Sequence, residues 1–240
     1  MNLKKKVMQN RLPKHVAIIL DGNGTWAKKR GLNRQAGHKH GALNLRKIAL
    51  FSQTLGIQCL SVYAFSTENW KRPTEEVDYL MALPKVFEEE FKDAFEDYDI
   101  KVVFTGRRDR LSKENIELLK RVEKETKDRL GLILNVGLDY GGQDEIVRAA
   151  QAWSKTSNKP LDVKLFSSYL DTAQLPEVDF LIRPGGHQRL SNYMLWQAAY
   201  AELYFTKIPW PAFNEKAFLK AIRVYQKRVR KFGGLKGSKT

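Results

Sequence analysis

The fold of this chain is read most directly from HVAIILDGNGTWAKK, residues 15–29. Residues 15–20 are apolar after the first histidine and show no polar alternation, which is typical of a strand buried on both faces of a parallel sheet. Similar runs lie at 60–65, 100–105, 132–136, 178–183 and 203–205, and segments with helical spacing lie at 42–55, 77–95 and 118–130. This alternation predicts an α/β fold with a mainly parallel central sheet of about six strands covered by helices.

Length and composition agree with a single domain. The chain has 240 residues, of which 42% are hydrophobic, enough for one substantial core and short for two. We expect one domain over residues 1–240, with loose tails at 1–12 and 235–240. Because Cys59 is the only cysteine, a disulfide framework and a zinc site of paired thiolates are excluded. A cytoplasmic protein without a signal peptide or a membrane-spanning run is therefore expected.

The net charge favours anionic partners. Lys and Arg number 42 against 27 Asp and Glu, which gives a formal charge of +15. Nucleic acid, lipid headgroups and diphosphates would all satisfy this charge, and charge alone does not choose among them. Peripheral contact with an anionic membrane is one expectation that follows.

The residues after the first predicted strand form a loop suited to an anion. Ligands of open parallel sheets gather at the carboxyl ends of the strands. Gly22 and Gly24 let the backbone approach a phosphate at the start of a helix. The spacing Gly22-x-Gly24-x-x-Ala27 also resembles a dinucleotide fingerprint, but the next strand begins about forty residues later and no acidic residue follows at the ribose-binding distance. We therefore set the dinucleotide interpretation aside.

Asp21 is the distinguishing residue of this loop. A carboxylate beside a bound phosphate would repel it unless a cation lay between them, and Mg²⁺ is the natural bridge. The alternative is that Asp21 only caps the turn through its own side chain. Downstream, Arg34 and His38 stand near the start of the next predicted helix, within reach of the same phosphate.

A second polar cluster follows the second predicted strand. It combines hydroxyl, carboxylate, amide, indole and guanidinium groups, in Ser66, Thr67, Glu68, Asn69, Trp70 and Arg72. The structural alternative is a helix N-cap at Ser66 or Thr67, with Glu68 in the first turn and Pro73 opening a helix. That alternative explains only part of the cluster, so a binding role is also expected.

A third cluster follows the fifth predicted strand. Arg183, Arg189 and Ser191 stand around a glycine pair and suit a second diphosphate, which implies two charged substrates. Glu202 lies in an apolar segment, where a buried carboxylate needs a metal ion or an arginine as partner. The apolar side chains of the 77–95 segment either fill the core or line an elongated tunnel. They include Met81, Phe87, Phe91 and Phe95.

These motifs resemble those of the undecaprenyl diphosphate synthase (cis-prenyltransferase) family. The resemblance runs in the family's order from about residue 13 to Gly234, where the chain reads Lys231-Phe232-Gly233-Gly234. The other motifs are Asp21-Gly22-Asn23-Gly24-x-Trp26-Ala27, Gly37-His38-x-x-Gly41, Tyr63-Ala64-Phe65-Ser66-Thr67-Glu68-Asn69-Trp70, Arg183-x-Gly-Gly, Arg189-Leu190-Ser191-Asn192 and Trp210-Pro211-x-Phe213. The resemblance implies a fold that encloses an apolar tunnel. It also implies a Mg²⁺-dependent enzyme that condenses isopentenyl diphosphate with a farnesyl-type allylic diphosphate, to give undecaprenyl diphosphate or a product of related length.

The resemblance also implies roles for individual residues. Asp21 and Asn69 would be catalytic. Asp21 would hold Mg²⁺, and Glu202 would complete the metal environment, either within the chain or across a homodimer interface. The allylic diphosphate would lie on the 22–25 loop with Trp26 at its chain, and isopentenyl diphosphate on the third cluster. The residues expected to bind substrate are Gly22, Asn23, Gly24, Thr25, Trp26, Arg34, His38, Ser66, Thr67, Glu68, Trp70, Arg72, Arg183, Arg189, Leu190 and Ser191.

Five positions depart from the family's pattern. Thr25 stands where an arginine is usual, and Asp139 and Gln143 stand where asparagine and arginine are typical. Pro184 replaces a usual threonine, and His187 occupies a position that is usually acidic. A catalytically weak paralogue, or a supporting subunit of a prenyltransferase, therefore remains the alternative. A nucleic-acid-binding protein is not favoured, because the arginines follow strands beside carboxylates instead of forming a basic face with exposed aromatic side chains.

Overall fold

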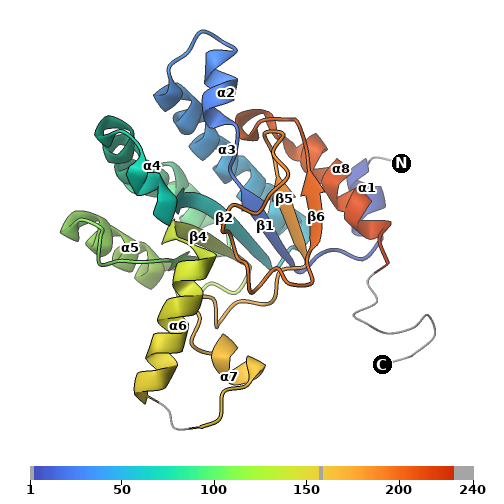
Figure 1. The fold of residues 1–240 in the computed structure, drawn as a ribbon. Coiled ribbons are helices and arrows are strands. Elements are labelled where there is room, and N and C mark those ends of the chain that lie inside the picture. The colour runs from blue at the N-terminus through green and yellow to red at the C-terminus, as the bar shows by residue number, and fades with distance from the viewer. Residues whose placement is uncertain (1–2, 157–158, 230–240) are drawn as a thin grey trace.

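Six parallel strands form one sheet with helices packed on both faces (Figure 1). The computed structural model describes residues 3–156 and 159–229, with the backbone alone for 92–97. The sheet order is β3-β4-β2-β1-β5-β6, and every neighbouring pair is parallel. The predicted α/β fold is confirmed. The strands are β1 (His15–Ile19), β2 (Cys59–Ser66), β3 (Ile100–Thr105), β4 (Leu132–Tyr140), β5 (Phe180–Arg183) and β6 (Glu202–Phe205).

The helices begin and end at local signals in the sequence. In α3, the Asn33 side chain accepts a hydrogen bond from the Ala36 N–H, and Gly56 ends the helix with a left-handed φ of 84°. Within the described residues, no helix is both long and apolar enough to cross a membrane. The helices are α1 (Leu3–Met8), α2 (Asn23–Lys28), α3 (Arg34–Leu55), η1 (Thr67–Lys71), α4 (Thr74–Asp97), α5 (Lys113–Thr126), α6 (Gly142–Thr156), α7 (Val163–Ser167), η2 (Trp210–Ala212) and α8 (Glu215–Gln226).

The two faces of the sheet belong to different apolar clusters. Val16 and Ile18 of β1 point into the large core with side chains of α3, α4, α5 and α8. Ala17 and Ile19 of the same strand pack on the other face, against a cluster that contains Tyr193. Because successive side chains of a strand point to opposite faces, β1 is buried on both of its faces. This explains why the strand runs of the sequence are continuously apolar.

The prediction of a loose tail at residues 1–12 is wrong. Leu3–Met8 forms α1, in which Val7 is fully buried and packs in the core that α8 also enters. The Gln226 side chain donates hydrogen bonds to the carbonyl groups of Val7 (2.8 Å) and Arg11 (3.2 Å). An apolar contact and two hydrogen bonds hold the segment in place. The second expected tail, 235–240, lies outside the described residues.

Two helix boundaries also differ from the prediction. The helix expected to reach residue 130 ends at Thr126, and Leu130 is 91% exposed. Pro73 does not occupy the first helical position, because α4 begins at Thr74 and the Pro73 carbonyl accepts the N–H groups of Glu76 and Val77. Pro73 therefore stands one position before the first helical residue, where its carbonyl accepts the first hydrogen bonds of the helix.

A buried polar network crosses the centre of the sheet. His15 of β1 is fully buried; its Nδ1 lies 2.7 Å from the Pro176 carbonyl oxygen and its Nε2 2.7 Å from Ser61 Oγ of β2. Asn135 of β4 donates to the same Ser61 Oγ at 2.9 Å. Burial lowers the pKa of His15 to about 4, although the Pro176 carbonyl and Asp179 favour the charged ring. The network therefore requires a neutral imidazole.

We expect His15 to make the fold sensitive to mild acid. Its folded-state pKa of about 4 lies below the ordinary value of 6.5, so the unfolded chain binds the proton more readily and stability falls as the pH drops from 6.5 towards 4. Between pH 7.5 and 5 this one group should cost about 2 kcal/mol of unfolding free energy. Urea unfolding of the wild type and of His15→Gln at both pH values measures it. Equal losses for the two proteins would contradict the assignment.

Candidate active site

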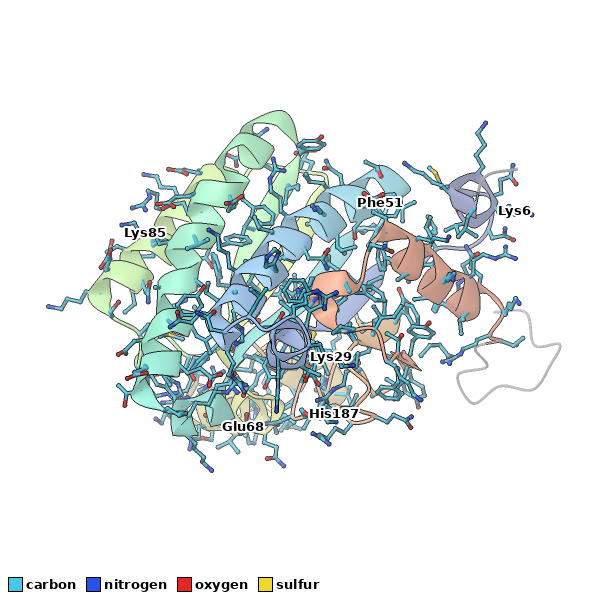
Figure 2. The ribbon with its side chains drawn as sticks, turned by 90° about the horizontal axis from the view of Figure 1, so that it is seen from above. Lys6, Lys29, Phe51, Glu68, Lys85 and His187 are labelled. Carbon is cyan, nitrogen blue, oxygen red and sulfur yellow. The ribbon has the colours of Figure 1, made fainter. Side chains whose placement is uncertain are left out.

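A cavity of about 560 Å³ lies at the carboxyl ends of β1, β2 and β5, between the sheet and helices α3 and α4. This is the edge at which parallel α/β sheets bind their ligands. The loops that follow these three strands carry Lys29, Glu68 and His187, which gather in one part of the view from above (Figure 2). Segments far apart in the sequence contribute Asp21, Glu68 and Arg183 to the lining of one cavity.

The lining of the cavity has a polar part and an apolar part. The polar side chains are Asp21, Asn23, His38, Ser66, Glu68, Asn69, Arg72, Arg183, Ser191 and Asn192. The apolar residues come mainly from α3, α4 and the strands, and include Leu45, Phe65, Leu80, Leu83, Phe87, Phe104, Val136 and Leu138. A ligand with a charged head and an apolar tail fits such a lining. The sequence left open whether Phe87 is core or tunnel; it lines the cavity, whereas the side chain of Phe95 lies outside the described residues.

An ion pair between Asp21 and Arg183 joins the first and the third predicted clusters. Arg183 Nη2 and Nε lie 2.9 and 3.2 Å from Asp21 Oδ2, and the Arg183 side chain is only 6% exposed. Arg183 Nη1 also donates to Ser191 Oγ at 2.7 Å and to the Arg189 carbonyl. Arg183 therefore joins two other predicted residues, Asp21 and Ser191. Arg189 contributes its backbone here, and Leu190 packs against the apolar cluster of the other sheet face.

The loops that carry Asp21 and Arg183 touch through glycines. Gly22 has a φ of 96° and Gly185 a φ of 89°, both in the left-handed region. A Cβ atom on Gly22 would lie 2.8 Å from the Pro209 Cβ, and one on Gly185 would lie 3.0 Å from the Asp21 backbone. Only glycine allows both the dihedral angle and the approach. The Gly22 N–H donates to Asp21 Oδ1 at 2.7 Å, so Asp21 caps the turn, and its role in holding Mg²⁺ stays a prediction.

Arg34, His38 and Arg72 converge on Glu76, a residue that the sequence analysis missed. Glu76 Oε1 lies 2.9 Å from both Arg34 Nη2 and Arg72 Nη1, and 3.9 Å from His38 Nε2. Glu76 stands four residues after Arg72, and this spacing would have predicted the ion pair between Arg72 and Glu76. Burial and the neighbouring Arg72 lower the pKa of His38 to about 4, against the opposing effect of Glu76. His38 is therefore neutral at pH 7, and its expected phosphate contact would be a hydrogen bond.

The 66–72 segment serves both as a cap and as part of the site. Ser66 caps η1, and its N–H donates to Asn69 Oδ1 at 3.1 Å. Glu68 accepts a hydrogen bond from Asn192 Nδ2 at 2.8 Å, which links the second cluster to the third. Burial acts to raise the pKa of Glu68, but the Asn192 bond and those of its own turn outweigh it and lower the pKa. Ser66, Glu68 and Asn69 line the cavity; Thr67 instead packs beside Gly141.

Nine of the predicted substrate residues do not line the cavity, namely Gly22, Gly24, Thr25, Trp26, Arg34, Thr67, Trp70, Arg189 and Leu190. Trp26 packs on His40, with ring centroids 4.7 Å apart, and Arg30 lies 4.3 Å above the Trp26 ring. The Trp70 indole N–H donates to Asp139 Oδ1 at 2.8 Å, so Trp70 anchors η1. Gly24 faces the Arg34 guanidinium, and Thr25 is exposed. Direct contact of these side chains with substrate stays a prediction.

Glu202 corrects the expected metal environment. It pairs with Phe180 at the amino ends of β6 and β5, whereas Arg183 and the site lie at the carboxyl ends. Its carboxylate binds Arg228 Nη1 at 2.7 Å, which supplies the arginine partner that the sequence analysis demanded. The prediction that Glu202 and Asp21 of the same chain share a metal site is therefore wrong. The version in which Glu202 reaches across a homodimer interface stays a prediction.

Asp21 alone fits one kind of Mg²⁺ site. Across the described parts of the chain, no group of three or more His, Cys, Asp or Glu side chains could cage a metal ion. Mg²⁺, however, is commonly held by one or two carboxylates together with substrate phosphates and water. The Asp21 carboxylate is 27% exposed and lines the cavity among other polar side chains. The residues present thus fit an ion that arrives with a diphosphate.

Known proteins match this chain over nearly its whole length. Residues 19–233 match the family model described as "Putative undecaprenyl diphosphate synthase". The isoprenyl transferase of Geobacillus kaustophilus (strain HTA426) is 48% identical over 238 residues, which are 97% of this chain and 93% of the relative. That of Aquifex pyrophilus is 46% identical over 226 residues, 94% of this chain and 98% of the relative.

A solved structure extends the likeness to three dimensions. The crystal structure of lavandulyl diphosphate synthase from Lavandula x intermedia in complex with dimethylallyl diphosphate has a TM-score of 0.89 and 34% sequence identity. The match covers 95% of this chain and 99% of that one. Sequence and fold thus agree over the entire domain and not over one motif alone. The chain therefore belongs to the undecaprenyl diphosphate synthase family of isoprenyl transferases.

Proposed function

We propose that this chain condenses isopentenyl diphosphate with an allylic diphosphate of the farnesyl type and makes a cis-polyprenyl diphosphate of undecaprenyl or related length. The observation that carries the proposal is a single cavity in which the Asp21–Arg183 pair stands beside an apolar space. A diphosphate needs cations and hydrogen-bond donors, and a prenyl chain needs apolar surroundings. One cavity offers both to the same substrate. Membership of an isoprenyl transferase family supports prenyl transfer as the chemistry.

The allylic diphosphate would bind between the 22–25 loop and the start of α3. Asp21 would hold Mg²⁺ there; when bound, the ion would neutralise negative charge on the departing diphosphate. The backbone N–H groups of the loop and the Arg34 guanidinium would donate to the same phosphates. His38, neutral because burial and Arg72 lower its pKa to about 4, would add a hydrogen bond. Such fixed donors stabilise the charge that develops as the allylic C–O bond breaks.

Isopentenyl diphosphate would bind at the third cluster. Arg183 lines the cavity and is held in place by Asp21 and Ser191, so an incoming phosphate would meet a guanidinium in a fixed position. Arg189 and Ser191 would supply further donors. Asn69, whose carboxamide oxygen accepts from the Ser66 N–H, would position the homoallylic end beside the allylic carbon, with Arg72 nearby. Orientation of two bound reactants is itself a large part of the rate enhancement.

The apolar part of the cavity would protect the reaction and hold the product. An allylic cation reacts with water, so water must be excluded while the new C–C bond forms. Leu80, Leu83 and Phe87 of α4 face Phe104 and Val136 of the strands across this space. The growing chain would lie here, and the packing at the far end would limit its length. The product length is therefore a property of this lining.

A homodimer at a membrane surface completes the proposal. Glu202 lies away from its own site, and nearby Tyr200 is 66% exposed, which suits a second copy on this edge of the sheet. We place the enzyme in the cytoplasm, in agreement with its free, buried Cys59. Peripheral contact with anionic lipid would help it release an apolar product. No role for nucleic acid is proposed.

The weak-paralogue alternative rests mainly on Thr25. Its side chain is exposed and does not line the cavity. Against this loss, Asp21, Asn69, Arg183 and Ser191 all line the cavity with their hydrogen bonds made. A protein that serves only as a supporting subunit would not need these four polar side chains in one cavity. The active enzyme is therefore the better supported function.

Replacing Asp21 tests its proposed role in binding the metal. Asp21→Asn keeps an oxygen for the Gly22 N–H but loses the charge, so elongation of farnesyl diphosphate with labelled isopentenyl diphosphate should fall about 10²- to 10³-fold. Chromatography of the products by chain length, with and without Mg²⁺, measures it. Asp128→Asn, at a side chain 88% exposed, is the control. Undiminished Mg²⁺-dependent elongation by Asp21→Asn would refute the assigned role.

Thr25→Arg should improve use of the allylic substrate. A guanidinium at the 22–25 loop adds one charge-assisted contact to a phosphate, worth about a tenfold lower KM for the allylic diphosphate. The KM for isopentenyl diphosphate should change little. Thr156→Arg, an exposed threonine at the end of α6, is the matched control. A KM that is equally unaffected in both variants would show that the lost arginine has no bearing on this site.

Membrane contact should depend on the basic surface of α2 and α3. No acidic residue occurs from Gly22 to Thr67, while the exposed 28–35 segment carries Lys28, Lys29, Arg30 and Arg34. Each such cation near an anionic bilayer contributes about 1 kcal/mol, so Lys28→Glu with Lys29→Glu should weaken co-sedimentation with phosphatidylglycerol vesicles more than tenfold. Lys120→Glu with Lys124→Glu on α5 is the control. Equal binding of both double variants, or strong binding to phosphatidylcholine, would exclude this surface.

A further inference from the structure

Asp139 is a buried carboxylate that the proposed chemistry does not use. It is the penultimate residue of β4 and fully buried, and its φ of 50° lies in the left-handed region, which is uncommon for a residue other than glycine. Its carbonyl accepts the Arg107 N–H at 3.0 Å. A strained, buried acid persists only where surrounding contacts hold it. Those contacts show what it does.

The carboxylate of Asp139 is shared between one indole and one guanidinium. Trp70 Nε1–H donates to Oδ1 at 2.8 Å, Arg110 Nε donates to Oδ2 at 2.8 Å, and Arg110 Nη2 reaches Oδ1 as well. The Arg110 guanidinium also lies 5.6 Å from the centroid of the Trp70 ring. A buried charge is costly unless it is paired, and Arg110, whose side chain is 39% exposed, supplies the pairing from the surface.

Trp70 connects this group to the active site. It belongs to η1, the turn that presents Glu68 and Asn69 to the cavity. Its ring packs edge-on against Phe65, with centroids 5.2 Å apart. The indole N–H bond to Asp139 therefore holds the far side of a short turn whose near side carries site residues. A turn of five residues has few internal hydrogen bonds, so an external anchor decides where its side chains point.

We propose that Asp139, paired with Arg110, is a positioning residue that acts through Trp70 to fix Asn69 and Glu68 in the cavity. It does not line the cavity. An asparagine in its place can accept the indole N–H but cannot form an ion pair with the guanidinium. Through its ion pair with Arg110, Asp139 therefore links the 106–112 loop after β3 to Trp70 of η1.

The proposal is tested by hydrogen exchange of the 66–72 amides together with steady-state kinetics. Asp139→Ala should raise exchange in this segment about tenfold relative to the amides of β1 and β5. It should lower kcat about 10²-fold and change the KM of the allylic diphosphate less than threefold, because Asn69 is displaced while the 22–25 loop is not. Trp70→Phe, which keeps an aromatic ring but removes the indole N–H, should reproduce both effects. Asp139→Asn should restore most of both.

Two further variants separate positioning from general stability. Arg110→Gln alone leaves a buried charge unpaired and should loosen the turn, whereas Arg110→Gln in the Asp139→Asn background should loosen it less. Asp109→Asn, at an exposed acid that pairs with Arg107, is the matched control and should leave exchange and kcat unchanged. Exchange that rises uniformly over the sheet, or an unaltered turn in Asp139→Ala, would overturn the proposal. The exchange arm decides this even if the elongation reaction assumed above is not observed.

Discussion

The ion pair between Asp21 and Arg183 is the interaction on which the rest of the structure depends. Arg183 is almost fully buried, so its charge must be balanced where it stands. The balance comes from a strand neighbour: β1 and β5 are adjacent and parallel, and the two side chains follow or end these strands at the same edge. Two loops with left-handed glycines then close upon each other, and the site is assembled around the pair.

The position of this pair follows from the topology of the sheet. From β1 the chain continues to β2 on one side, and from β5 it continues to β6 on the other, so the connections diverge between β1 and β5. Such a switch point leaves a crevice at the carboxyl ends of the strands. Helices α3 and α4 form its wall and add apolar side chains. A charged end and an apolar space therefore share one cavity because of strand order.

Much of this arrangement could be predicted from the sequence. Buried parallel strands read as apolar runs, so all six were located, and residues that follow strands mark the ligand edge; Asp21, Asn69 and Arg183 do line one cavity. The roles of Trp26 and Trp70 could not be read in this way, because an aromatic side chain in a binding motif can equally well pack behind it. Glu202 was misplaced because its metal role came from the family resemblance and not from its position, which is at the amino end of β6, away from the ligand edge.

By itself, the sequence determined the α/β class, the strand runs and the chemical groups that gather at the carboxyl edge, because apolar period and residue type are local properties. Only the tertiary structure decided which charges meet. Glu76 of α4 gathers Arg34 from α3 and Arg72 from the connection after η1, and Asp139 engages Trp70 from η1 and Arg110 from the loop after β3. Such pairings depend on distances between segments far apart in the chain. Those distances exist only once the sheet order and the helix packing are formed.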